Sequence, residues 1–283
     1  MNPTTAAIRA GWRRGLIELR QSVTNGQDLF GHLFWPAVLL IVMFFLRDNK
    51  IGGGAVLLGA LMLPSVLGMN LAMNGLIGIG QYLAVDREDG TLLRAKATPN
   101  GLLGYLVGKI VLVAGVLLGG LLLVLIPGSF FVDGLTLGSP GSWLSLLGVV
   151  LLGMLATLPF GAIFGSLVSS PRSLGAFMLP MSGFIAISGI FYPITSMPGW
   201  LQWIAQVSPI YWLGLGMRAA LLPDSAVAVE LGHSWRHLET VGVLGIWAVA
   251  GMVLAPVVLR RMARRESGSS VLQRRERALQ RVG

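Results

Sequence analysis

Long apolar runs separated by short polar segments dominate the 283-residue chain. A helix needs about 20 residues to cross a hydrocarbon core of about 30 Å, and six of the runs reach that length. The six predicted spans cover 29–46, 55–80, 103–126, 143–168, 173–192 and 240–259. The pattern therefore predicts an all-α polytopic membrane protein whose transmembrane domain occupies residues 29–259.

Residues 1–28 before the first span form a predicted cytoplasmic N-terminus with an amphipathic helix. Its apolar residues recur at helical spacing: Ile8, Trp12, Leu16 and Leu19. Charged residues surround them, among them Arg13, Arg14 and Glu18. A basic amphipathic helix that contains a tryptophan is typical of a segment lying in the membrane interface. We therefore expect an interface helix here, and membrane lipids as one of its partners.

Composition and charge agree with a membrane protein. Only 12% of residues are charged and the mean hydropathy is +0.75, whereas a soluble domain carries about 25% charged residues. Of the 21 lysines and arginines, seventeen fall on one side of the six-span topology. The positive-inside rule then places both termini in the cytoplasm. The basic tail, 260–283, is explained by topology and anionic lipid, and we expect no nucleic-acid partner.

The segment 81–109 is a compact charged stretch between two apolar runs. We predict a short cytoplasmic helix between spans two and three, capped by Thr91 and closed before Pro99. Such a rigid connector suits the transmission of force from a soluble partner. Its candidate residues are Asp86, Arg87, Glu88, Asp89, Gly90, Thr91, Arg94, Thr98 and Pro99.

The outer connection 191–239 contains two apolar pieces that are too short to span and are dense in aromatic residues. We interpret them as a re-entrant or interfacial helix pair broken at Ser208-Pro209. A seventh span broken by Pro209 is disfavoured because it would move the arginine-rich tail outside. The pair contains Pro198, Trp200, Trp203, Pro209, Tyr211 and Trp212.

Enzyme chemistry finds little support in the sequence. Asp86-x2-Asp89-Gly90-x3-Arg94 resembles part of the metal-binding run of membrane CDP-alcohol phosphotransferases, but the second pair of carboxylates is missing. That phosphotransferase remains an alternative. We expect no metal site, no catalytic residue and no cofactor in this chain. It has no phosphate-binding loop, so any Mg-ATP belongs to another polypeptide.

Taken together, several loose motifs resemble the type-2 membrane permeases of ATP-binding-cassette (ABC) exporters, and the daunorubicin-type antibiotic and drug exporters in particular. Between spans two and three these are Asp86-Arg87-Glu88, Gly90-Thr91, Thr98-Pro99 and Gly108-Lys109. After span five they are Phe191-Tyr192-Pro193, Met197-Pro198-x-Trp200, Ser208-Pro209 and Met217-Arg218.

This resemblance implies a half-transporter in the cell membrane. A second copy or a homologous permease would complete a dimer, and a separate ABC ATPase subunit would drive it. The 86–97 segment would be the coupling helix, and the outer helix pair a lid on the exit. A hydrophobic drug, antibiotic or lipid is the expected substrate, and polysaccharide export is an alternative.

The resemblance also implies that spans two and five face a central substrate path. Span two offers a strip of amides and thioethers, Met69, Asn70, Met73 and Asn74. In span five, Phe177, Met181, Phe184 and Ser188 share one helical face. Such surfaces suit an apolar guest with a few polar groups. Alternatively, the two asparagines only hydrogen-bond between helices and hold the dimer together.

Overall fold

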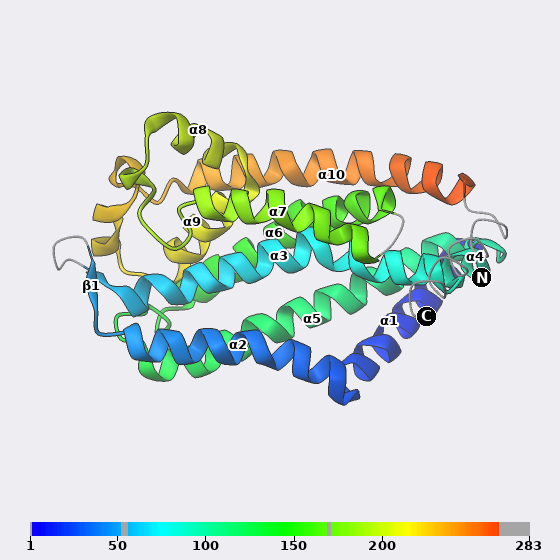
Figure 1. The fold of residues 1–283 in the computed structure, drawn as a ribbon, viewed down its shortest axis with the longest axis horizontal. Helices are drawn as coiled ribbons and strands as arrows, with labels where there is room; N and C mark the ends of the chain where they lie inside the picture. The colour runs from blue at the N-terminus through cyan, green and yellow to red at the C-terminus, as the bar shows by residue number, and fades with distance from the viewer. Residues whose placement is uncertain (1, 52–55, 169–170, 266–283) are drawn as a thin grey trace.

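The computed structural model describes residues 2–51, 56–168 and 171–265, without the side chains at 50, 51, 56, 171–174, 176–178 and 265. Within these ranges the chain is almost entirely helical. A two-stranded antiparallel ribbon joins β1 (Lys50–Ile51) to β2 (Val56–Leu57). Figure 1 shows the long helices running along the molecule's longest axis, with β1 and α8 (Gly199–Val207) at one end and α4 (Thr91–Lys96) at the other.

Five described helices are long and apolar enough to cross a membrane. They are α2 (Gly26–Leu46), α3 (Leu58–Glu88), α5 (Gly101–Phe131), α6 (Pro140–Leu167) and α10 (His237–Arg265). The span predicted over 173–192 corresponds to α7 (Pro171–Ile187), whose 17 residues rise about 26 Å. The all-helical, multi-pass class is confirmed, and the count of six spans stays a prediction.

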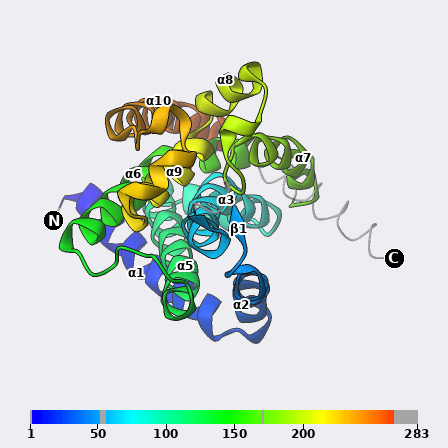
Figure 2. The ribbon, with the colours of Figure 1, turned by 90° about the vertical axis from the view of Figure 1, so that its left-hand side faces the viewer.

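α3 is the central helix of the molecule. It packs against α5, α6 and α7, and Figure 2 shows it between α6 on one side and α7 on the other. Glycines let the α3 and α6 backbones touch. A methyl group added to Gly80 would lie 3.1 Å from the carbonyl oxygen of Gly161 and 3.1 Å from the Cα of Gly165. Gly161 and Gly165, one turn apart on α6, therefore allow this close helix packing.

The helix boundaries correct one sequence prediction. α3 continues eight residues beyond the predicted end of span two, so Asp86, Arg87 and Glu88 lie in its last turns. The short connector α4 begins only at Thr91, and the helix predicted over 86–97 is wrong at its start. Thr91 is also not the cap. The N-cap is Gly90, whose φ of +78° lies in the left-handed region that a residue without a Cβ adopts readily.

The end of the molecule opposite α4 is built from short helices. α8 and α9 (Pro209–Leu221) meet at Ser208, so the predicted break before Pro209 is confirmed. α9 is buried against α3, α6 and α10. The short 3₁₀ helices η1 (Ile194–Ser196), η2 (Asp224–Val229) and η3 (Leu231–His233) complete this end.

Candidate functional site

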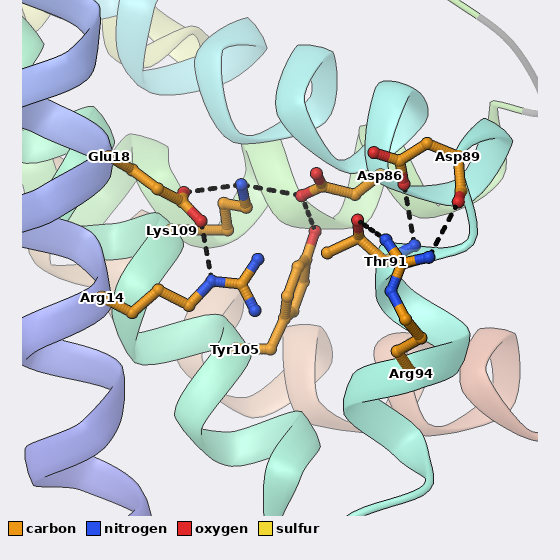
Figure 3. A network of polar contacts seen from close by, with 8 residues as sticks. All are labelled: Arg14, Glu18, Asp86, Asp89, Thr91, Arg94, Tyr105 and Lys109. Carbon is orange, nitrogen blue, oxygen red and sulfur yellow. Dashed lines mark hydrogen bonds and ion pairs between the residues drawn. The ribbon is translucent and has the colours of Figure 1, made fainter.

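A buried polar network joins three helices at the α4 end of the molecule (Figure 3). The ammonium of Lys109, on α5, lies 2.8 Å from Glu18 Oε2 of α1 (Pro3–Thr24) and 2.8 Å from Asp86 Oδ2 of α3. Tyr105 donates its hydroxyl proton to Asp86 Oδ2 over 2.7 Å. Arg14 donates to Glu18 Oε1 over 2.7 Å. One ammonium therefore links the interface helix to two predicted spans.

The charges in this network balance and are largely screened from solvent. Lys109 is 5% exposed and Asp86 is 8% exposed, so neither ion has water as its main partner. Burial alone would raise the pKa of the Glu18 carboxyl, but the hydrogen bonds and charges of Lys109 and Arg14 lower that pKa below its usual value. For Arg14 the balance is the mirror image. Burial alone would lower the pKa of its guanidinium, but the hydrogen bond and charge of Glu18 raise that pKa above its usual value. Removing one member of such a set leaves an uncompensated buried charge and therefore destabilises the fold.

Two glycine pairs bring the network together. Gly11 and Gly15 of α1 face Gly104 and Gly108 of α5, and their lack of a side chain lets the two backbones approach closely. A methyl group on Gly15 would come within 2.6 Å of the Gly108 carbonyl oxygen. Trp12 of the same helix stays 55% exposed. The interface helix therefore packs its glycines and Leu19 against α5 and leaves Trp12 exposed, an arrangement that places Glu18 beside Lys109.

The short helix α4 is fixed to the same site. Asp89 Oδ1 accepts a hydrogen bond from the Thr91 backbone N–H over 2.7 Å, and Arg94 donates to the Thr91 hydroxyl over 2.8 Å. Leu92 is 1% exposed and belongs to the buried cluster that contains Leu83 of α3 and Tyr105 of α5. One side of α4 is thus anchored in the core, while Arg94 remains exposed.

A cleft of about 460 Å³ separates α1 from α4 and the first turn of α5. Arg14 lines it on the α1 side, and Arg94, Thr98 and Pro99 line it on the α4 side. Small residues such as Ala7 form much of the remaining wall. The predicted coupling residues and the predicted interface helix therefore meet at one concave, cationic surface.

The other predicted residues of this region have separate positions. Arg87 donates to the backbone carbonyls of Ser166 and Val168, over 3.3 and 2.6 Å, and so ties the end of α3 to the end of α6. Glu88 is half-buried and Arg13 is exposed.

The asparagines predicted for the substrate path lie one turn apart on α3, and Asn70 faces α5. A methyl group on Gly120 of α5 would come within 3.3 Å of the Asn70 amide. Asn74 donates its side-chain N–H to the Asn70 backbone carbonyl over 3.0 Å, and Asn70 Oδ1 is buried without a hydrogen-bond partner among the described residues. Met69 and Met73 pack against the main hydrophobic cluster.

The residues on and beside α7 that we predicted to line the substrate path differ in their exposure. Met181 packs against the same hydrophobic cluster, whereas Phe184 is 43% exposed. Ser188 lies just beyond the helix end, where its hydroxyl donates to the Ile185 carbonyl over 2.7 Å. Phe177 lies outside the residues whose side chains are described.

The predicted lid residues divide into two groups. Pro198, Trp200 and Trp203 are exposed on and beside α8. Pro209, Tyr211 and Trp212 are buried on α9. Trp212 donates its indole N–H to the Gln206 carbonyl over 2.6 Å, which fixes the angle between the two helices.

Sequence reasoning missed two ionic anchors. Lys109 lies near the start of an apolar run, and a cation in such a place signals a buried partner. Arg218 lies inside the apolar α9, where it is 3% exposed and forms a double hydrogen bond with the buried Glu230. Both cations stand out within apolar segments of the sequence, but the carboxylates that neutralise them cannot be identified there.

Comparison with known proteins agrees with this architecture. A family model described as ABC-2 family transporter protein matches residues 51–257, from β1 into α10. No curated protein matches the chain. Because the match covers well over half of the sequence, this protein belongs to the ABC-2 family of transporter proteins and is a multi-pass permease component that works with an ATP-binding-cassette subunit.

Proposed function

We propose that this chain is the permease half of an ABC exporter in the cell membrane. It moves a hydrophobic or amphipathic compound, such as a drug, an antibiotic or a lipid, out of the cytoplasm or the inner leaflet. ATP hydrolysis on the separate ATP-binding subunit drives the movement. A second copy or a homologous permease completes the dimer, and the daunorubicin-type exporters are the subgroup that its motifs favour.

The observation that carries this proposal is the cationic surface between α1 and α4. Permeases of this family work with an ATP-binding-cassette subunit, and that subunit needs a cytoplasmic surface of the permease on which to act. Arg94 and the cleft beside it offer such a surface at the α4 end of the molecule, which we take as cytoplasmic from the positive-inside rule.

Force reaches the spans through buried contacts. Leu92 carries a displacement of α4 into the cluster shared with Leu83 and Tyr105, on α3 and α5. The Lys109 contacts carry it to α1 and to the end of α3. Packed interiors switch between discrete arrangements instead of deforming smoothly. ATP biases such a switch only through contacts that differ between the two states, and the surface around α4 is where they form.

The exported compound would pass between the two halves along α3 and α7. Met69, Met73 and Met181 give an adaptable apolar lining, and Phe184 has the exposure needed to touch a guest. Because Asn70 faces α5, Asn74 is the stronger candidate for a polar contact with the compound. α8 and α9 would form the lid at the outer end, with the exposed Trp200 and Trp203 as its surface.

Export measured in cells tests the proposal. Gly90→Pro removes the left-handed N-cap of α4, and Glu88→Ala changes the last turn of α3 before it. Both variants are expected to insert normally and to abolish export together with the response of the ATPase to substrate. Gly138→Ala is the control, because a methyl group there meets no atom within 4 Å. Unchanged export by a normally inserted Gly90→Pro variant would refute the coupling role of α4.

A further inference from the structure

A second cavity, larger than the α1–α4 cleft, opens on the side of the molecule away from α7. It has a volume of about 920 Å³ and runs between α5, α6 and α10. Figure 2 shows α6 and α10 on the opposite side of α3 from α7. The groove is therefore separate from the proposed export path, and its volume lies near the upper end of the range for ligand pockets, about 300–1,000 Å³.

The walls of the groove are apolar and partly exposed. Ile110 and Leu151 line its mouth and are 47% and 53% exposed. Leu158 and Leu259 lie deeper and are 7% and 4% exposed. On the outside of a helix bundle that faces hydrocarbon, such a recess is complementary in shape and polarity to an apolar chain.

The groove has a polar group at one end only. Asn100 lies just before the start of α5 and Arg260 lies in the last turns of α10, so both line the end nearest α4. Arg260 is exposed and has no carboxylate partner among the residues that the structure describes. The remaining lining is almost entirely hydrocarbon. An amphipathic anion, with its charge at the α4 end and its chain along the groove, is the complementary occupant.

The length of the groove matches one leaflet. Its lining on α5 extends from Leu102 to Ala114, a rise of about 18 Å at 1.5 Å per residue. Half of a hydrocarbon core of about 30 Å is about 15 Å. A chain that begins at the Arg260 end therefore reaches the middle of the bilayer and stops there. This is the geometry of one lipid from the leaflet on the α4 side.

We propose that the groove between α5, α6 and α10 binds one anionic phospholipid of the cytoplasmic leaflet. One of its two acyl chains lies against Ile110 and Leu158, and its phosphate pairs with Arg260 beside Asn100. The leaflet assignment takes the α4 end as cytoplasmic. The binding itself does not depend on which compound is exported.

Native mass spectrometry of the purified full-length chain tests this site. Delipidated protein is titrated with phosphatidylglycerol or with phosphatidylcholine, and the first bound lipid is counted. The wild type is expected to prefer phosphatidylglycerol. Arg260→Gln should weaken the binding of phosphatidylglycerol about tenfold, as expected for one lost hydrogen bond to a charged group. Arg261→Gln is the matched control, because it removes one exposed charge from the next position, which does not line the groove.

A second pair of variants tests the apolar part of the groove. Ala114→Phe fills it and should remove the first bound lipid, whereas Ala37→Phe adds the same ring to an exposed position on α2 and should have no effect. If Ala114→Phe does not accumulate, Ile110→Gln places an amide on the groove wall instead and should give the same loss.

Three results would overturn the proposal. Equal losses in Arg260→Gln and Arg261→Gln would show only general attraction of lipid to a basic helix end. Equal retention of phosphatidylcholine would show ordinary surrounding lipid. A disulfide between two copies carrying Leu151→Cys, in a chain with no cysteine of its own, would show that protein covers the groove.

Discussion

The replacement of Lys109 by methionine tests the three-helix network most sharply. Methionine keeps most of the length and apolar volume of the side chain and removes its charge. In the structure the lost ammonium lies 2.8 Å from a carboxylate oxygen of Glu18 and 2.8 Å from one of Asp86. Lys109→Met therefore leaves two carboxylates facing each other in a largely buried site, with only Arg14 and Tyr105 to compensate.

The size of the effect follows from distance and burial. At an effective dielectric constant of about 20, each 2.8 Å contact supplies about 6 kcal/mol of attraction, most of which desolvation offsets. Breaking a buried pair by removing one partner costs about 3–5 kcal/mol. Because the side chain of Glu18 keeps 20% exposure and can partly regain water, we expect a loss of free energy of unfolding near the lower limit, about 3 kcal/mol.

Thermal unfolding of the detergent-purified protein, followed by the fluorescence of its eight tryptophans, measures this loss. Arg20→Met is the matched control. It removes an exposed cation from the same interface helix and should change stability by less than about 0.5 kcal/mol. The triple variant Lys109→Met, Glu18→Gln, Asp86→Asn should regain much of the lost stability, since the one charge it leaves unpaired is that of Arg14, whose side chain is 42% exposed and can be hydrated. Equal melting temperatures for Lys109→Met and Arg20→Met would refute the network as a structural link.

The remaining predictions use the same unfolding assay. Gly11→Ala should destabilise the protein by about 1–3 kcal/mol, because the added methyl group meets the α5 backbone. Gly31→Ala, whose methyl group meets no atom within 4 Å, should be neutral or stabilising, and equal effects of the two changes would contradict the tight α1–α5 contact. The difference in free energy of unfolding between wild type and Glu18→Gln should stay constant above about pH 4.5 and shrink as the pH falls through the lowered pKa of Glu18. If this difference instead changed near pH 7, the direction of the pKa shift would be contradicted. Arg218→Met should lower the free energy of unfolding by about 3–5 kcal/mol, because it leaves Glu230 buried and unpaired. Adding Glu230→Gln should restore part of this stability, and no restoration would show that the two side chains act separately.

The membrane class and the break between α8 and α9 could be predicted from local patterns. Apolar run length depends only on the thickness of the bilayer, and Ser208-Pro209 ends one helix and begins the next by the chemistry of those two residues. The start of α4 could not be predicted in the same way. Two features set this start. Packing against α6 and the hydrogen bonds of Arg87 extend α3 beyond the apolar run, and Gly90 then adopts a positive φ that ends α3 and begins α4.

The network and the α1 packing needed three-dimensional information. Glu18 and Lys109 are 91 positions apart in sequence, and no spacing rule joins them. The periodicity of Trp12 and its apolar neighbours predicted a helix, which α1 confirms, but gave no sign of the contact with α5. The contact that positions Glu18 is made by Gly11 and Gly15, whose lack of a side chain is inconspicuous in a hydrophobicity pattern.

The coupling surface is tested most directly by cross-linking within a complex assembled from this chain and its ATP-binding subunit. A photoreactive phenylalanine analogue is placed at Lys96, exposed on α4, or at Trp203, 74% exposed on α8 at the opposite end. We expect irradiation to join the Lys96 variant, but not the Trp203 variant, covalently to the ATP-binding subunit. An adduct from Trp203 and none from Lys96 would contradict the assignment of α4 and α1 as the surface on which ATP hydrolysis acts.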